Sequence, residues 1–311
     1  MASGFSMDRE AATSGTFERQ ASAFRRWVAA DGSTDFPVET GRYHLYICWA
    51  CPWAHRTAIG RRVMGLEDAI GMSAVDPIRD ARGWRFSGGE YVDPVNGFEF
   101  LAEAYAATDP DFDGRVSTPV LWDTETARIV NNESGDILRM LVTDFAAVAE
   151  HPVELHPTDL AGAIDALEAE LYDGLNNAVY RAGFATSQAA YETDARRVFA
   201  TLDRLDARLT GSRYLLGEGI TEADWRAFTT LVRFDAVYHT HFRCNGARIV
   251  DYPNLWDYTR DLYQQPGIAE TVRMDEIKAH YYRTHPMINP SGIVPIGPEL
   301  DFTAPHGRDA L

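Results

Sequence analysis

The chain has 311 residues, of which 45% are hydrophobic and 24% charged, and its formal net charge at pH 7 is −17. This length and composition predict a globular protein of two domains. The negative charge disfavours nucleic acid or an anionic membrane surface as a partner, because the long-range field repels both. No run of about 18 apolar residues occurs, and residues 1–20 lack an apolar stretch. We therefore expect no membrane span or secretory signal, and a cytoplasmic location.

The first half of the chain has the pattern of a small α/β domain. Residues 1–40 show no clear periodicity and are expected to form an extension over the folded body. From Arg42 to Cys48, apolar and polar residues alternate, which predicts a strand, and a helical pattern follows at residues 52–64. Three further strands and one helix are expected, at residues 66–75, 115–123, 128–130 and 134–148. This order predicts an α/β domain over residues 41–149.

The second half is expected to be helical. Two prolines and two histidines mark a linker at residues 150–157, and helical periodicity dominates from there on. Thr221 and Asp224 have the spacing of a capping box, which predicts a helix start. We therefore expect an all-α domain at residues 158–285. Five prolines in the tail, residues 286–311, exclude a long helix, so the tail is expected to wrap back over the body.

The three cysteines are too few for a disulfide framework, so a cysteine in a special setting is a candidate for catalysis. Cys51 precedes Pro52, and proline is favoured at the first position of a helix. Cys51 therefore falls at or beside the N-cap, where unpaired N–H groups and the helix dipole favour a thiolate. Cys48, at the end of the predicted strand, lacks this field. Cys51 is the candidate nucleophile.

Other interpretations of these cysteines stay open. Cys51 could be a small buried residue that happens to precede a helix. Cys48 and Cys51 could also form a dithiol redox pair. In such pairs the second thiol normally lies inside the helix, at the position that Ala54 holds here, so a single thiol resolved by an external thiol fits better. A Cys51–His55 hydrolase lacks a visible third group, and His55, which as an imidazolium could stabilise the thiolate, is expected at the helix surface.

His239, His241 and Cys244 carry donor atoms that could bind a metal ion. Their short, alternating spacing does not match a four-ligand zinc site, so we expect helix-end residues there and no metal.

Two other stretches could bind a ligand. Pro119 opens a predicted strand, and a cis peptide bond there would present the backbone of Thr118 to a ligand. Glu133 and Ser134 precede a predicted helix, whose free N–H groups could accept a carboxylate. We expect Ser134 or a neighbour to cap this helix, and Glu133 to bind a ligand ammonium group.

Several separate motifs resemble one family. They are Cys51–Arg56, Gly83–Phe86, Pro119–Asp123, Ile129–Ser134 and His306–Asp309. Together, over residues 24–308, they resemble the glutathionyl-hydroquinone reductases, which are the Xi class of the glutathione transferases. The resemblance implies a thioredoxin-like N-terminal domain, an all-α C-terminal domain, glutathione as co-substrate and a homodimer.

The resemblance also implies roles for residues of the first domain. Cys51 would be the nucleophile that forms a mixed disulfide with glutathione. The backbone of Thr118, beside a cis Pro119, would hold glutathione, together with Glu133 and Ser134 at the γ-glutamyl end. The glutathione would further contact Trp84 and Arg85, and Trp84 would also border the hydroquinone.

Three tyrosines of the second domain, Tyr172, Tyr238 and Tyr281, match those that line the aromatic-substrate site in this family. Their hydroxyls would bind the quinol oxygens and favour the keto tautomer, which helps the carbon–sulfur bond to break. Each of them could instead be an ordinary, partly buried phenol.

The chain departs from the family at two positions: Cys48 replaces a more common serine, and Thr118 replaces a valine. Cys48 leaves open an auxiliary disulfide with Cys51 that would protect against over-oxidation. A different class of function, a binding or scaffold module with this fold, also stays open, because a fold does not determine a function.

Overall fold

The computed structural model describes residues 15–311, so the first 14 residues of the predicted extension lie outside the described residues. The described chain divides into two compact units, and neither is one continuous stretch. The unit that we call the α/β unit comprises residues 20–154 and 275–280. The unit that we call the helical unit comprises residues 15–19, 155–274 and 281–311.

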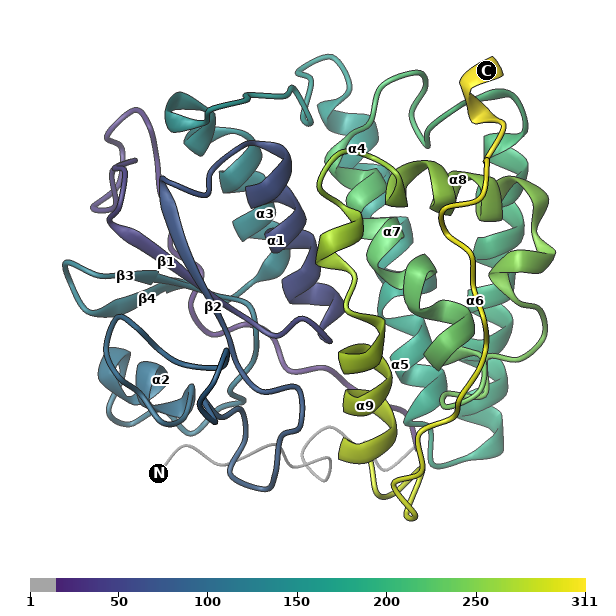
Figure 1. Ribbon diagram of the computed structural model, residues 1–311, viewed down its shortest axis with the longest axis horizontal. Helices are drawn as coiled ribbons and strands as arrows, with labels where there is room; N and C mark the ends of the chain where they lie inside the picture. The colour runs from purple at the N-terminus through teal and green to yellow at the C-terminus, as the bar shows by residue number, and fades with distance from the viewer. Residues whose placement is uncertain (1–14) are drawn as a thin grey trace. The chain divides into compact units, whose positions relative to one another are not determined.

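A four-stranded sheet in the order β2-β1-β3-β4 forms the frame of the α/β unit (Figure 1). The strands are β1 Tyr43–Ile47, β2 Ile70–Ala74, β3 Val120–Asp123 and β4 Arg128–Asn131. β1 pairs in parallel with β2 and antiparallel with β3, which pairs antiparallel with β4. All four predicted strands are therefore confirmed. β3 begins five residues later than predicted, because the proline at position 119 has no N–H to give to a ladder.

The α/β unit also holds three helices, α1 Pro52–Val63, α2 Ala102–Thr108 and α3 Ser134–Val142, and residues 275–280 of α9 Met274–Thr284. Figure 1 shows α1 and α3 side by side on one face of the sheet and α2 on the other. Gly60 lets α1 and α3 approach, since a Cβ there would lie 2.6 Å from a methyl carbon of Leu138. The predicted helix over residues 134–148 ends early, and its last part is a 3₁₀ turn, Asp144–Val148.

The part of the extension from residue 20 lies along the edge of the sheet. The backbone N–H of Arg26 donates to the carbonyl of Val130 at 3.0 Å, and the N–H of Asn132 donates to the carbonyl of Phe24 at 3.0 Å. These bonds occupy the free edge of β4 and bring the extension next to the start of α3.

The helical unit is built from α4 Ala161–Leu171, α5 Ala178–Gly183, α6 Gln188–Arg208, α7 Glu222–Arg233, α8 Pro253–Tyr263 and the last turn of α9 Met274–Thr284. The predicted capping box is confirmed at α7, where the Asp224 carboxylate accepts the backbone N–H of Thr221 at 2.7 Å. Short 3₁₀ turns lie at Leu209–Gly211, Ile249–Asp251, Ala269–Thr271 and Arg308–Ala310. Two π-helical turns, Tyr172–Asn176 and Phe234–Tyr238, follow α4 and α7.

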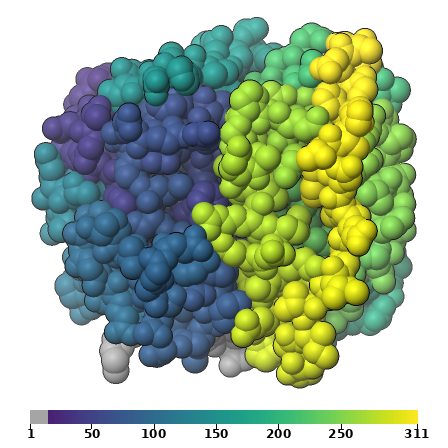
Figure 2. All heavy atoms as spheres, in the orientation of Figure 1, coloured from purple at the N-terminus to yellow at the C-terminus, as the bar shows by residue number. Residues whose placement is uncertain are grey.

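The tail lies on the helical unit, as predicted. In Figure 2 it runs as a continuous yellow band over the surface of that unit. The side chain of Gln264 donates to the carbonyls of Phe302 and Ala304, and the buried Arg308 donates to the carbonyls of Leu209 and Arg213. Within residues 15–311, no helix is both long and apolar enough to cross a membrane.

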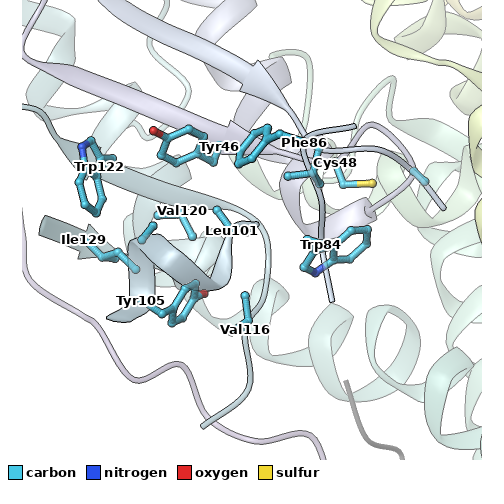
Figure 3. Packing of buried hydrophobic residues seen from close by; sticks show 13 residues of the cluster. Tyr46, Cys48, Trp84, Phe86, Leu101, Tyr105, Val116, Val120, Trp122 and Ile129 are labelled. Carbon is cyan, nitrogen blue, oxygen red and sulfur yellow. The ribbon is translucent and has the colours of Figure 1, made fainter. Parts of the chain in front are cut away.

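A cluster of buried side chains fills the side of the sheet that faces α2 (Figure 3). Figure 3 shows Trp122 and Ile129 at one end of this cluster and Cys48 and Trp84 at the other. Cys51 is partly buried and packs against the same cluster. The core of the α/β unit therefore reaches up to the turn that joins β1 to α1.

Candidate functional site

Cys51 is the N-cap of α1, as predicted. Its backbone is extended, with φ −77° and ψ 119°, and Pro52 stands at the first helical position. The side chain is only partly buried, and its thiol donates to the carbonyl oxygen of Thr118 at 3.6 Å. The position leaves the thiol beside the positive end of the helix.

Cys48 differs from Cys51 in its exposure. Its side chain is 0% exposed, and all three cysteines are free thiols. Burial raises the pKa of the Cys48 thiol well above its usual value. Cys51 is therefore the cysteine of this pair that solvent and small molecules can reach.

His55 does not lie at the helix surface, and this prediction is wrong. The side chain of His55 is 0% exposed. The reason is that every residue of α1 from Pro52 to Gly60 is buried, because the helix packs on α3 as well as on the sheet. The amphipathic pattern of a surface helix, on which the prediction rested, does not apply to a helix covered on most sides.

The Thr118–Pro119 peptide bond is cis. Thr118 is 5% exposed, and its carbonyl oxygen is the acceptor of the Cys51 thiol. The backbone that the sequence suggested for ligand binding thus lies directly beside the candidate nucleophile.

The expectation that Ser134 or a neighbour caps α3 is confirmed, and the N-cap is the neighbour, Glu133. One carboxylate oxygen of Glu133 accepts the backbone N–H of Gly135 at 3.2 Å, and the other accepts the hydroxyl of Ser22 at 2.8 Å. The Ser134 side chain is buried. The sequence could not reveal the contact with Ser22, because 111 positions separate the two residues. The carboxylate is held in place by both bonds.

Trp84 and Arg85 follow one another but lie in different surroundings. The Trp84 ring is buried and stacks on the ring of His280 with centroids 5.3 Å apart. His280 is itself fixed by a 2.6 Å hydrogen bond between its Nδ1 and the carbonyl of Pro77. Arg85 is 43% exposed and forms an ion pair with Glu99 at 3.2 Å. Trp84 is therefore a rigid surface, whereas Arg85 has a carboxylate partner already.

Two of the three predicted tyrosines meet in the core of the helical unit. The hydroxyls of Tyr238 and Tyr281 are 3.0 Å apart, and the hydroxyl of Tyr281 also hydrogen-bonds that of Tyr180. Burial raises the pKa of Tyr238 and of Tyr281 well above the usual value, so both phenols keep their protons. Tyr172, by contrast, is 44% exposed and lies outside this buried group.

Tyr180 belongs to the same buried group, although the sequence alone does not predict it. It lies on α5, in a stretch with no motif, and it is identified only by its neighbours. Its ring contacts those of Tyr238 and Tyr281, with centroids 6.0 and 6.4 Å away, and the guanidinium of Arg19 lies 4.8 Å above it. The structure thus defines a triad of buried phenols, Tyr180, Tyr238 and Tyr281, which we call the tyrosine triad.

His241 is a core residue of the helical unit. Its Nε2 lies 3.1 Å from Nδ1 of His285, and the two rings stack with centroids 5.3 Å apart. Burial, helped by the positive charge of Arg243, lowers the pKa of His241 to about 4. Within the described residues, no group of three or more His, Cys, Asp or Glu side chains could hold a metal ion.

Comparison with protein families identifies the class of both halves. The glutathione S-transferase N-terminal domain matches residues 50–144, and the glutathione S-transferase C-terminal domain matches residues 188–261. The first match includes Cys51, the cis Pro119 and Glu133.

Individual relatives narrow the class. The chain is 50% identical to the glutathionyl-hydroquinone reductase YqjG of Escherichia coli, over 96% of this chain and 93% of that protein. It is 47% identical to the glutathionyl-hydroquinone reductase PcpF of Sphingobium chlorophenolicum, over 91% of this chain and 90% of that protein.

Solved structures of similar proteins support the same family. A Xi-class transferase from Natrialba magadii is 51% identical, with a TM-score of 0.94, covering 98% of this chain and 94% of that one. The glutathione-bound structure of YqjG gives a TM-score of 0.89 at 49% identity, covering 92% of this chain and 96% of that one. The chain therefore belongs to the glutathionyl-hydroquinone reductases, the enzymes of the Xi class of glutathione transferases.

Proposed function

We propose that this protein reduces glutathionyl-hydroquinones to hydroquinones, with glutathione as co-substrate and a Cys51–glutathione mixed disulfide as intermediate. The observation that carries this proposal is the place of Cys51, a partly exposed thiol at the N-cap of α1 beside the backbone of Thr118. The sequence identity of 50% and 47% to two reductases of this name, over more than nine tenths of the chain, supports the choice of substrate.

In the first step, the Cys51 thiolate attacks the glutathione sulfur of the substrate. A Cys51–glutathione disulfide forms, the bond between sulfur and ring carbon breaks, and that carbon takes up a proton, so that hydroquinone leaves. In the second step, the thiolate of a free glutathione attacks the glutathione sulfur of the mixed disulfide. Glutathione disulfide leaves, and Cys51 returns to the thiolate. A serine in place of Cys51 could not form the intermediate.

Glutathione is held by the domain at residues 41–149 in this proposal. The backbone of Thr118 beside Pro119 binds its central part, and Glu133 with Ser134 binds the γ-glutamyl end. The Glu133 carboxylate suits the ammonium group of that end because hydrogen bonds already fix it at the start of a helix. Trp84 offers a flat, rigid surface, and Arg85 offers a charge that Glu99 shares.

The aromatic ring is assigned to the helical domain at residues 158–285. Tyr238 and Tyr281 donate hydrogen bonds to the quinol oxygens, which favours the keto tautomer and lets the ring carbon accept a proton. Their raised pKa values support this role, because a donor has to stay protonated. Tyr180 joins them on the evidence of the tyrosine triad, and Tyr172 keeps its proposed place on the resemblance alone.

Three further features belong to the proposal. The physiological substrates are conjugates of quinones, the protein works as a homodimer, and its location is the cytoplasm. The reaction as written needs no metal, since thiolates and proton donors perform both steps.

A half-reaction tests the proposal. The purified protein is incubated with a glutathionyl-hydroquinone without free glutathione, and intact mass is measured together with hydroquinone release. We expect one glutathione on Cys51 and one hydroquinone per protein, and neither in Cys51→Ser. Cys244→Ser, which removes a buried cysteine of the helical unit, serves as the matched control and should behave as the parent does. Absence of both adduct and hydroquinone would remove the reductase function and leave a binding module.

A further inference from the structure

A second thiol lies one turn away from the candidate nucleophile. Cys48 directly follows β1, and Cys51 is the N-cap of α1, with Trp49 and Ala50 forming the turn between them. The backbone N–H of Cys51 donates to the carbonyl of Cys48 at 3.0 Å. In such a turn the first and fourth Cα atoms lie within about 7 Å of one another. A disulfide spans Cα distances of about 4.4 to 6.8 Å, a range that such a turn allows.

Cys48 and Cys51 also act on each other through their charges: after burial, the nearby Cys51 is the largest cause of the raised pKa of Cys48. Both cysteines also pack against the same buried cluster, whose end at Cys48 and Trp84 is visible in Figure 3. The two side chains thus share one corner of the core.

The two thiols differ in what can reach them. Cys48 is 0% exposed, so neither glutathione nor an oxidant approaches it directly. Burial also raises its pKa, so the Cys48 thiol stays protonated until it meets an activated sulfur. Cys51 is partly exposed and lies beside the positive end of α1. Cys48 therefore depends on another protein sulfur for thiol exchange, and Cys51 lies across the same turn.

We propose that Cys48 is a resolving cysteine, and that the pair gives this protein a second activity, the glutathione-dependent reduction of hydroperoxides. The second activity rests on the proposed function, because it uses Cys51 as the same nucleophile. It differs in that it breaks an oxygen–oxygen bond and needs Cys48.

The reaction begins at Cys51. Its thiolate attacks one oxygen of a hydroperoxide, the oxygen–oxygen bond breaks, and the leaving alkoxide takes a proton to become an alcohol. Cys51 is oxidised by two electrons to a sulfenic acid, and the peroxide is reduced by the same two. The Cys48 sulfur then attacks the Cys51 sulfur, and the sulfur–oxygen bond breaks. The Cys48 proton leaves with the hydroxyl as water, and a Cys48–Cys51 disulfide results.

Two glutathiones restore the thiols. The first attacks the accessible Cys51 sulfur and returns Cys48 to a buried thiol, which leaves the same Cys51–glutathione disulfide that the proposed function uses. The second releases glutathione disulfide and the Cys51 thiolate. The sum is one hydroperoxide and two glutathiones converted to one alcohol, one water and one glutathione disulfide, so atoms and electrons balance.

Hydrogen peroxide is the probe for the test. The reduced protein is treated with one equivalent, the remaining thiols are alkylated under denaturing conditions, and peptides are mapped by mass spectrometry. We expect Cys48 and Cys51 to be joined by a disulfide in the parent and in Cys244→Ser, the matched control. In Cys48→Ser we expect a Cys51 sulfenic acid that dimedone traps, and over-oxidation to the sulfinic acid about tenfold faster than in the parent.

Each outcome decides between the two proposals. A disulfide in the parent that is absent from Cys48→Ser supports Cys48 as the resolving thiol. A parent protein that accumulates a Cys51 sulfenic acid without the disulfide overturns the inference. If that same parent accepts glutathione from a glutathionyl-hydroquinone, the reductase function stands without it. If Cys51 reacts with neither compound, both proposals fail together.

Discussion

Glu133→Gln separates the two tasks that the structure and the proposed function give to one side chain. As the N-cap of α3, Glu133 accepts the backbone N–H of Gly135 at 3.2 Å and the hydroxyl of Ser22 at 2.8 Å. Glutamine keeps an oxygen for Gly135, and its amide can donate to the Ser22 oxygen. We therefore expect the free energy of unfolding to change by less than about 1 kcal/mol.

The binding of glutathione should respond more strongly. A hydrogen bond between charged groups contributes about 1.5–3 kcal/mol. Because Glu133 is only half-buried, solvent screening reduces this to about 1–2 kcal/mol. This range corresponds to a dissociation constant for glutathione that is roughly 5- to 30-fold higher in the variant.

Calorimetric titration measures the effect, with glutathione and with an analogue that lacks the γ-glutamyl amino group. The variant should lose affinity for glutathione and lose little for the analogue. Asp136→Asn is the matched control, since Asp136 stands in the same first turn but pairs with Arg25 at 2.6 Å. An equal loss for both ligands, or none for glutathione, would refute the assignment of Glu133 to the ammonium group.

Three other substitutions test the ion pair at the sheet, the packing of α5 and the tyrosine triad. Asp123→Asn leaves Arg42 without its bidentate carboxylate and should cost about 3 kcal/mol in urea unfolding. Burial opposes ionisation of Asp123, but the hydrogen bonds from Arg42, Thr126 and the backbone of Glu125 together outweigh it and lower the pKa. This stabilisation is therefore complete above about pH 4 and is lost as pH falls through the lowered pKa. The difference in unfolding free energy between the two proteins should shrink over that range. Gly183→Ala places a Cβ 2.2 Å from the ring of Phe242 and should destabilise the protein by about 1–3 kcal/mol; thermal melting at the parent's midpoint would contradict the packing. Tyr281→Phe should slow hydroquinone release by about 100-fold and leave the KM for glutathione unchanged; an unchanged single-turnover rate would exclude the phenol from the reaction.

The starts of α1 and α7 could be predicted from neighbouring residues in the sequence. Pro52 has a conformational preference of its own, so the N-cap position of Cys51 follows from neighbouring residues. The same holds for Thr221 and Asp224, whose capping box needs only three residues of spacing.

Predictions that depend on distant contacts were wrong or incomplete. His55 was assigned to the surface because a helix alone does not show that a second helix will cover it. The cap at Glu133 is completed by Ser22 from the extension, which no periodicity marks. Tyr180 becomes a candidate site residue through its hydrogen bond with Tyr281, which lies 101 positions later in the sequence. Burial and long-range pairing arise from tertiary structure, which overrides local preference.

The stacking of His280 on Trp84 has a consequence for the order in which the chain is made. The ring of His280 is fixed to the carbonyl of Pro77, 203 positions earlier, and both belong to the α/β unit. During synthesis the strands and helices up to Glu154 leave the ribosome well before the segment that covers Trp84 exists. The α/β unit is therefore completed late, by residues 275–280, and until then one face of Trp84 stays exposed to water and to other nascent chains. A fragment that stops at Glu154 should consequently bind chaperones and aggregate more readily than the full chain.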